Sequence, residues 1–375
     1  MLGIKMTEKY VMNQVLKAPV FFILIYLIII FLSLYDTSMD HLSIALLSYM
    51  LYVFVTLYLG WFLARKMFPV IKFTPVFYFR NINIIDFLMW CLIFNVIFSL
   101  INYVGVMGWT LDLSTYRQYL TVNVNHPLII NFSSIFNFAT YVIIPMIIFT
   151  RAKISKFRLL IILLSIISLG ILSTSRSFFI ILSIFILLNY VLTYGIKLKY
   201  ILVCFIFILA IFFIIPYFTG KNYSIDSFMI YLLGGIHALD KIINGVVPDL
   251  SYHGYYSFSF IAAIFSKFGL SDPRPLLDYI YVPAPTNVYT MLGVYFLDFG
   301  YYGSLIVISL IGFISGIIDK NYELHKTPRS VYLKSWNLTV LSLSFFYDYY
   351  TCSTIFIVLL CFSTLVNNKE NMCVE

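Results

Sequence analysis

Three arginines lie in parts of the sequence that contain few other basic residues. The guanidinium of an arginine can bind two phosphate oxygens at once. Arg176 belongs to the hydroxyl-rich sequence STSRS, residues 173–177, between two apolar runs. The serine hydroxyls and the N–H groups of a helix beginning here would suit a phosphate. A snorkelling arginine with capping serines is the structural alternative. We take Arg176, Ser175 and Ser177 as candidate anion-binding residues.

The other two arginines lie in polar stretches between apolar runs. Arg117 follows the sequence STY of residues 114–116, and Arg274 stands between two prolines in DPRP, residues 272–275. Each is a candidate phosphate-binding residue. Each also has an acidic neighbour, so ion pairs of Arg117 with Asp112, and of Arg274 with Asp272 or Asp278, are the alternatives.

With Arg176, two more residues are candidate catalytic residues. His253 lies in a polar loop, and its ordinary pKa suits a general base near neutral pH. Asp298 lies about two turns into an apolar run, where an acid needs a partner, and the spacing predicts Tyr295, Asp298 and Tyr302 on one helix face. Asp298 either takes part in the chemistry or pairs with a tyrosine or arginine to fix its helix.

The composition shows in which environment these residues must be positioned. Of the 375 residues, 62% are hydrophobic and only 11% are charged, whereas soluble domains carry about 25% charged residues. This excludes a soluble globular protein. A transmembrane helix takes about 20 residues, so a chain this long and this hydrophobic can cross the membrane many times. We expect an all-α integral membrane protein that forms a single polytopic domain over residues 1–375. The net charge of +8 indicates orientation in the membrane, so we expect no nucleic acid as partner.

Apolar runs predict about ten transmembrane helices, the first of them uncleaved. They fall near residues 19–34, 42–64, 85–107, 128–150, 158–173, 177–194, 199–218, 288–318, 331–346 and 352–366. In the eighth run, Gly312 and Gly316 form a small-xxx-small pattern that predicts close helix packing.

The distribution of lysine and arginine predicts the orientation. If both termini are cytoplasmic, 18 of the 24 basic residues lie on the cytoplasmic side and six on the other, as the positive-inside rule requires. The six outer cations are then exceptions that anion binding would explain: Arg117, Arg176, Lys221, Lys241, Lys267 and Arg274.

A long extracytoplasmic loop, residues 219–287, separates the seventh and eighth runs. Residues 228–247 and 255–270 are amphipathic and predict interfacial helices, with an extra pair of spans as the alternative. Four prolines shape residues 271–285 into an ordered loop. The five cysteines and the histidines show no metal-site spacing, and the outer loops hold no DxD pair, so we expect neither a metal nor any other cofactor.

The second half of the chain resembles the oligosaccharide repeat-unit polymerases, or O-antigen polymerases of the Wzy type. The resemblance rests on the number of spans, the late long loop, and three motifs: STSRS at 173–177, PTNVYT at 285–290, and YFLDFG at 295–300 with Gly303 beyond.

This resemblance implies a bacterial inner-membrane glycosyltransferase whose active site faces the periplasm. The enzyme would transfer a growing glycan from undecaprenyl diphosphate to a new lipid-linked repeat unit. Arg176 matches an arginine facing the lipid diphosphate, and Asn287, Tyr289 and Asp298 match positions lining the cavity. Undecaprenyl-diphosphate-linked oligosaccharide, membrane lipid and a chain-length regulator protein are the implied partners.

Two alternatives remain open. An O-antigen ligase would use the same donor but a lipid A core acceptor, and would be expected to have a more basic long loop. A lipid-linked oligosaccharide flippase or another transporter would need charged residues along a path through many spans.

Overall fold

The computed structural model describes most of the chain. The described residues are 14–36, 39–67, 81–110, 112–122, 136, 139–148, 154–173, 176–219, 225–245, 254, 256–258, 265, 269–270, 279–282, 284–286, 288–348 and 350.

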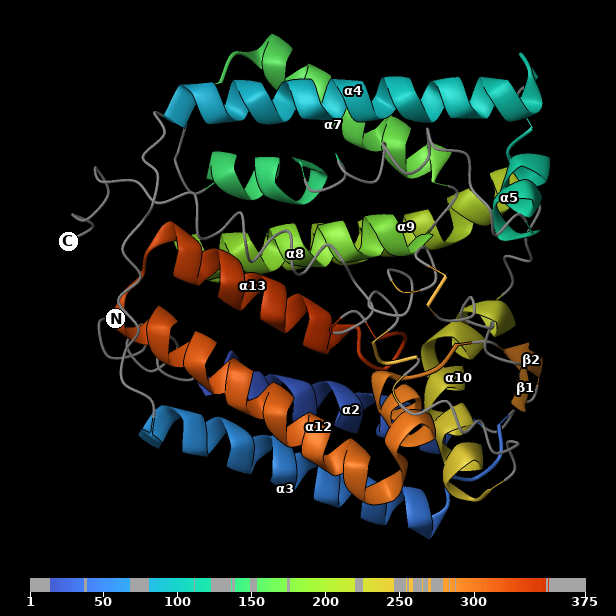
Figure 1. Cartoon of the computed structure of the whole chain (residues 1–375), viewed down its shortest axis with the longest axis vertical. Helices are drawn as coiled ribbons and strands as arrows, with labels where there is room; N and C mark the ends of the chain where they lie inside the picture. Colours follow the sequence, from blue (N-terminus) through green and yellow to red (C-terminus); the bar gives the residue numbers. More distant parts are fainter. Residues whose placement is uncertain are drawn as a thin grey trace. The chain divides into compact units, whose positions relative to one another are not determined.

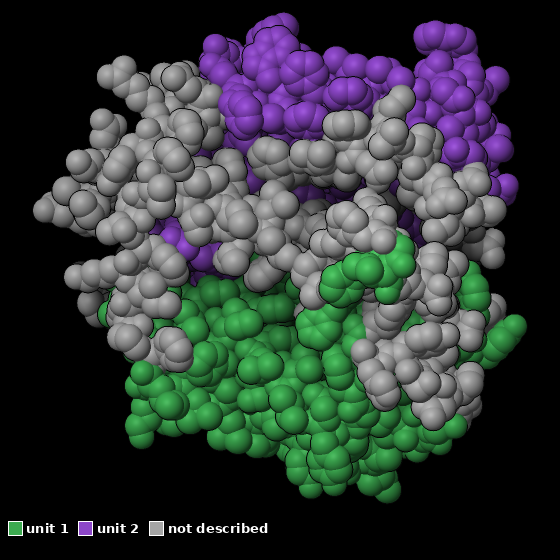
Figure 2. Space-filling view, in the orientation of Figure 1, with its two compact units in different colours: residues 1–72, 225–326, 336–357 green, residues 73–224, 327–335, 358–375 purple. Residues whose placement is uncertain are grey.

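The chain divides into two compact units, coloured green and purple in Figure 2. Unit 1 comprises Met1–Lys72, Ile225–Lys326 and Trp336–Ile357. Unit 2 comprises Phe73–Ser224, Thr327–Ser335 and Val358–Glu375. The boundary passes through helix α13, Pro328–Ser342.

Five helical stretches of the described residues are long and apolar enough to cross a membrane. They are Ala18–Tyr35, Ile44–Met67, Ile85–Met107, Arg176–Tyr194 and Met291–Leu324, and Ala139–Ile148 and Leu198–Ile214 are shorter apolar helices. Large apolar side chains such as Leu51 and Phe62 are exposed on them, as lipid-facing residues are. The predicted helical, multi-pass membrane protein is confirmed. The number of ten spans stays a prediction, and residues 352–366 lie outside the described residues.

Unit 1 is built on four helices, which Figure 1 labels α2, α3, α10 and α12. Their bounds are Ala18–Tyr35, Ile44–Met67, Ile225–Ile243 and Met291–Leu324. A small hairpin of β1, Ile280–Val282, and β2, Ala284–Thr286, pairs Ile280 with Thr286 in antiparallel register. This hairpin lies in the proline-rich stretch that was predicted to be an ordered loop, and it packs on α10.

Helices α3 and α12 pack along a seam of glycines. A methyl group on Gly60 would lie 2.1 Å from the carbonyl oxygen of Ser309. Methyl groups on Gly312 and Gly316 would lie 2.2 Å and 2.5 Å from the carbonyl oxygens of Leu57 and Trp61. Only hydrogen fits at such distances, so the predicted close packing at Gly312 and Gly316 is confirmed.

Gly300 breaks α12 into two segments, residues 291–299 and 301–324. Its φ is +65°, a value that L side chains rarely adopt. Thr290 caps the first segment by accepting a hydrogen bond from the Gly293 N–H at 2.9 Å. Because the break rotates the second segment, Tyr302 is 80% exposed whereas Tyr295 is buried. The expectation that both would share one face with Asp298 was therefore wrong.

Unit 2 contains α4, Asn81–Met107, α5, Leu113–Val122, and the consecutive helices α7, α8 and α9. The last three extend over Lys156–Leu172, Arg176–Tyr194 and Leu198–Thr219 (Figure 1). Ser155 caps α7 through the N–H of Arg158, and the Arg158 guanidinium pairs with Asp86 of α4 at 3.2 Å. Helix α7 ends at Leu172, and α8 begins at Arg176.

Candidate functional site

Arg176 is the first residue of α8 and is only 7% exposed. Its guanidinium carbon lies 4.3 Å from the centre of the Phe212 ring on α9. A guanidinium on an aromatic face gains cation–π attraction that increases where water is excluded. The helix N-terminus adds outward N–H groups and a partial positive charge. Arg176 thus has its charge in a setting suited to an anion.

The position of Arg176 follows from how closely α7 and α8 pack. A methyl group on Gly170 of α7 would lie 2.0 Å from the ring of Phe179 on α8, so the ring occupies the space that any side chain at 170 would need. The Ser173 hydroxyl donates to the Gly170 carbonyl at 2.8 Å at the end of α7. Ser177 is half-buried next to Arg176, and Ser175 lies outside the described residues.

Arg117 lies on α5, which contacts both α4 and α9. Asp112 caps α5 by accepting from the N–H groups of Ser114 and Thr115, each at 3.0 Å. Hydrogen bonds from the side chain and then the backbone of Thr115 lower the pKa of Asp112 below its ordinary value. The buried Tyr116 accepts from the Asn102 amide at 2.9 Å and fixes α5 on α4.

In unit 2, two of the predicted arginines lie on helices that contact α9. Arg117 lies on α5 and Arg176 begins α8, and both of these helices contact α9. The third arginine, Arg274, lies outside the described residues, as do His253 and Asn287.

Asp298 is buried in unit 1, where it holds a turn of the long loop. Its carboxylate accepts hydrogen bonds from the N–H groups of Tyr256, at 3.3 Å, and Ser257, at 2.5 Å, and from the Ser257 hydroxyl, also at 2.5 Å. Asp298 therefore has a structural partner, as one of the two alternatives predicted. The partner is a turn of the loop, and the predicted one was a tyrosine or arginine side chain. Asp298 thus fixes the backbone at Tyr256 and Ser257.

The start of α12 brings several buried polar residues together. Tyr289 is 2% exposed. The Tyr295 hydroxyl donates to the carboxylate of Asp348 at 3.2 Å, and the same carboxylate accepts from the Tyr350 N–H at 2.9 Å. Asp348 is fully buried and was not predicted as a site residue. The only feature of the sequence that pointed to Asp348 was its position, as an acidic residue shortly after the predicted ninth span.

Helix α10 is present where an amphipathic helix was predicted, but residues 233–240 are all buried within unit 1. The Asp240 carboxylate accepts from both the N–H and the hydroxyl of Ser43, which caps α3. Lys241 donates to the Tyr281 carbonyl at 2.6 Å and pairs with Asp40 at 3.6 Å. These contacts tie α10 to the start of α3 and to the hairpin.

His237 on α10 is 2% exposed, and its Nε2 has no hydrogen-bond partner among the described residues. Burial lowers the pKa of His237 below its ordinary value. Asp240, Asp40 and Asp36 act against this effect, and Lys241 adds to it. Burial therefore favours the neutral imidazole of His237.

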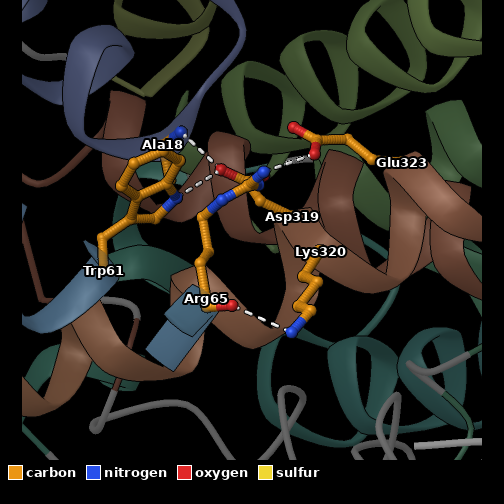
Figure 3. A network of polar contacts seen from close by, with 6 residues as sticks. All are labelled: Ala18, Trp61, Arg65, Asp319, Lys320 and Glu323. Atoms are coloured by element: carbon orange, nitrogen blue, oxygen red, sulfur yellow. Dashed lines mark hydrogen bonds and ion pairs between the residues drawn. The ribbon is translucent and has the colours of Figure 1, made fainter. Parts of the chain in front are cut away.

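At the other end of α3 and α12, a buried carboxylate joins three helices (Figure 3). Oδ2 of Asp319 accepts from the N–H of Ala18, the first residue of α2, at 3.0 Å and from the Trp61 indole N–H at 2.9 Å. Arg65 pairs with Glu323, and its carbonyl accepts from Lys320 at 2.9 Å. Asp319 was not predicted as a functional residue, and its signal in the sequence is an acid at the end of a long apolar run.

Within the part of the chain that the structure describes, no three His, Cys, Asp or Glu side chains are grouped as metal ligands would be. Comparisons of the chain with models of known protein families, with characterised proteins and with solved structures found no match.

Proposed function

We propose that this protein polymerises undecaprenyl-diphosphate-linked oligosaccharide repeat units at the outer face of the bacterial inner membrane. The observation that carries the proposal is Arg176, a buried guanidinium held on an aromatic ring at a helix N-terminus. A diphosphate at the membrane interface is an anion of matching charge and depth. Arg117, on a helix that contacts the same α9, is a second cation for it.

The charges at the two ends of the α7–α8 hairpin support this orientation. Arg176 begins α8, four residues after the end of α7, whereas Lys156 and Arg158 begin α7 and Lys197 follows α8. With 17 residues, α7 is about 26 Å long, somewhat less than the roughly 30 Å of the hydrocarbon core. With the basic end in the cytoplasm, Arg176 would lie at the depth of an outer-leaflet headgroup.

In the proposed reaction, a hydroxyl oxygen of the incoming repeat unit attacks the anomeric carbon of the growing glycan. A new glycosidic C–O bond forms as the bond to the diphosphate oxygen breaks. The electron pair leaves with undecaprenyl diphosphate, and the hydroxyl proton passes to a base, for which His253 is the candidate. Arg176 would stabilise the negative charge that develops on the leaving oxygen.

The other candidate residues fit supporting roles. Asp298 would act as a positioning residue through the turn at Tyr256 and Ser257, which follows His253. Asn287 and Tyr289 immediately precede α12 and would contact sugar. Mutation of Asp298 should then affect catalysis by displacing the loop.

The test gives the purified full-length protein a synthetic undecaprenyl-diphosphate repeat unit and follows the product by gel. A ladder is expected with the unaltered protein and with Arg158→Ala, which removes an arginine from the opposite end of the same helix pair. Arg176→Ala should lose the ladder, and Arg176→Lys should retain part of it.

Two results would overturn the proposal. One is the absence of a ladder although the protein binds the donor. The other is transfer of a single glycan to an added lipid A core acceptor without polymerisation, which would indicate a ligase.

A further inference from the structure

Two cations border one indole ring at the end of unit 1 that holds Asp319. The Lys17 ammonium lies 5.7 Å from the centre of the Trp61 ring, and the Arg65 guanidinium carbon lies 4.7 Å from it. Trp61 is 5% exposed and donates its indole N–H to Asp319 (Figure 3). Lys17 precedes α2 and Arg65 lies in the last turn of α3, so both cations are at helix ends.

Arg65 is held in position by groups on α12. Its Nη2 pairs with Glu323, and its backbone carbonyl accepts from the Lys320 ammonium at 2.9 Å. The side chain is 25% exposed. The carboxylates of Asp319 and Glu323 are thus outnumbered by Lys17, Arg65 and Lys320.

Both cations next to Trp61 retain hydrogen-bonding capacity. Among the described residues, the Lys17 ammonium contacts the Trp61 ring but has no hydrogen bond or ion pair. Nη1 of Arg65 is buried and has no acceptor among those residues. The buried Nη1 is out of reach of a ligand, but the Arg65 side chain is 25% exposed, so an anion can approach the guanidinium from that side.

We propose that Lys17, Arg65 and Trp61 form a binding site for the phosphate of an anionic phospholipid headgroup. The guanidinium suits two phosphate oxygens, and the ammonium adds a second charge. Tryptophan is enriched at the headgroup level of membranes. A lipid is favoured over free phosphate because the two cations lie at the ends of predicted transmembrane helices. On α3, apolar side chains such as Leu59 and Phe62 are exposed.

The experiment measures headgroup binding to the full-length protein in nanodiscs of phosphatidylcholine, titrated with phosphatidylglycerol at low salt. Binding is followed by thermal stability and by lipids retained in native mass spectrometry. Lys17→Gln removes one cation of the site, and Lys66→Gln is the matched control because Lys66 is exposed and lies next to Arg65. Inorganic phosphate in phosphatidylcholine nanodiscs forms a separate arm.

The unaltered protein and Lys66→Gln should prefer phosphatidylglycerol, and Lys17→Gln should bind it about fivefold more weakly, as expected for one cation near a headgroup. Arg65→Gln should weaken binding at least as much. Equal binding of both lipids, or equal effects of Lys17→Gln and Lys66→Gln, would overturn the proposal. Equal stabilisation by free phosphate would overturn the lipid assignment.

These measurements use no glycan donor. A failure of the polymerase assay therefore leaves this proposal standing, and a failure here leaves the proposed polymerase standing.

Discussion

The glycine seam between α3 and α12 gives a quantitative prediction. In Gly312→Ala, the new methyl group would lie 2.2 Å from the Leu57 carbonyl oxygen, 3.0 Å from its carbonyl carbon and 3.2 Å from its Cα. All three atoms belong to the backbone, so no side-chain rotation relieves the clash. The two helices must separate by roughly 1 Å to restore an ordinary contact.

The expected size of the effect combines two terms. Overpacking a close interface costs about 1–3 kcal/mol, and alanine in place of a helical glycine returns up to about 1 kcal/mol. Because the clash is with backbone atoms alone, the cost belongs at the upper end of that range, and we expect Gly312→Ala to lower the free energy of unfolding by about 2 kcal/mol. Gly105→Ala is the matched control, because a methyl group on Gly105 of α4 meets nothing within 4 Å. It should leave stability unchanged or raise it slightly.

The assay is reversible unfolding of the purified protein in mixed micelles, with helicity followed by circular dichroism. Gly60→Ala, whose methyl group would lie 2.1 Å from the Ser309 carbonyl oxygen, should be as harmful as Gly312→Ala. Both changes separate the same pair of helices, so the double variant should cost less than the sum of the two. A Gly312→Ala protein as stable as the unaltered one, or a Gly105→Ala protein equally destabilised, would refute this account of the seam.

Three further predictions concern single residues. Because burial lowers the pKa of His237, the folded state binds fewer protons than the unfolded state; stability should be full above the ordinary pKa of about 6.5 and fall as pH decreases towards the folded pKa. In His237→Gln, the free energy of unfolding should decrease less as the pH is lowered from neutral through the ordinary histidine pKa. If it decreases as steeply as in the unaltered protein, His237 is not the group responsible. Asp319→Leu should cost several kcal/mol, since it leaves the Ala18 and Trp61 N–H groups without their acceptor, and unfolding titration in mixed micelles should detect this; a loss below about 1 kcal/mol would indicate that water replaces the carboxylate. Gly300→Ala should cost about 1–3 kcal/mol, because φ +65° and ψ −169° lie in a region that is essentially restricted to glycine, while a methyl group there meets nothing within 4 Å. A cost near zero in the same titration would mean that the break in α12 readily rearranges.

The sequence was sufficient for features that repeat at a fixed spacing. Apolar runs predicted the helices, and Gly312 and Gly316, one helical turn apart, predicted a close packing seam. The partner residue Gly60 was not predicted, because a single glycine in an apolar run does not reveal which helix approaches it.

Contacts between distant segments were not predictable in this way. Asp298 was expected to need a partner, but its donors Tyr256 and Ser257 lie about forty residues earlier, in a stretch that was predicted to be an interfacial helix and forms a turn at residues 256–258. Asp319 caps a helix that begins 301 residues earlier. Tyr302 was assigned to the wrong face because nothing in the sequence showed that Gly300 would adopt a positive φ. In each case tertiary contacts determined the outcome.

The break at Gly300 has a consequence for the thickness of bilayer that the protein prefers. Residues 301–324 form a segment of 24 residues, the same length as α3, and each is about 36 Å long. The hydrocarbon core is roughly 30 Å thick, so both helices fit with a moderate tilt. Because the two backbones are in close contact at Gly60, Gly312 and Gly316, a thinner bilayer should tilt the two helices together as one pair. Hydrophobic mismatch would then be transmitted to residues 291–299 and to the turn that Asp298 holds.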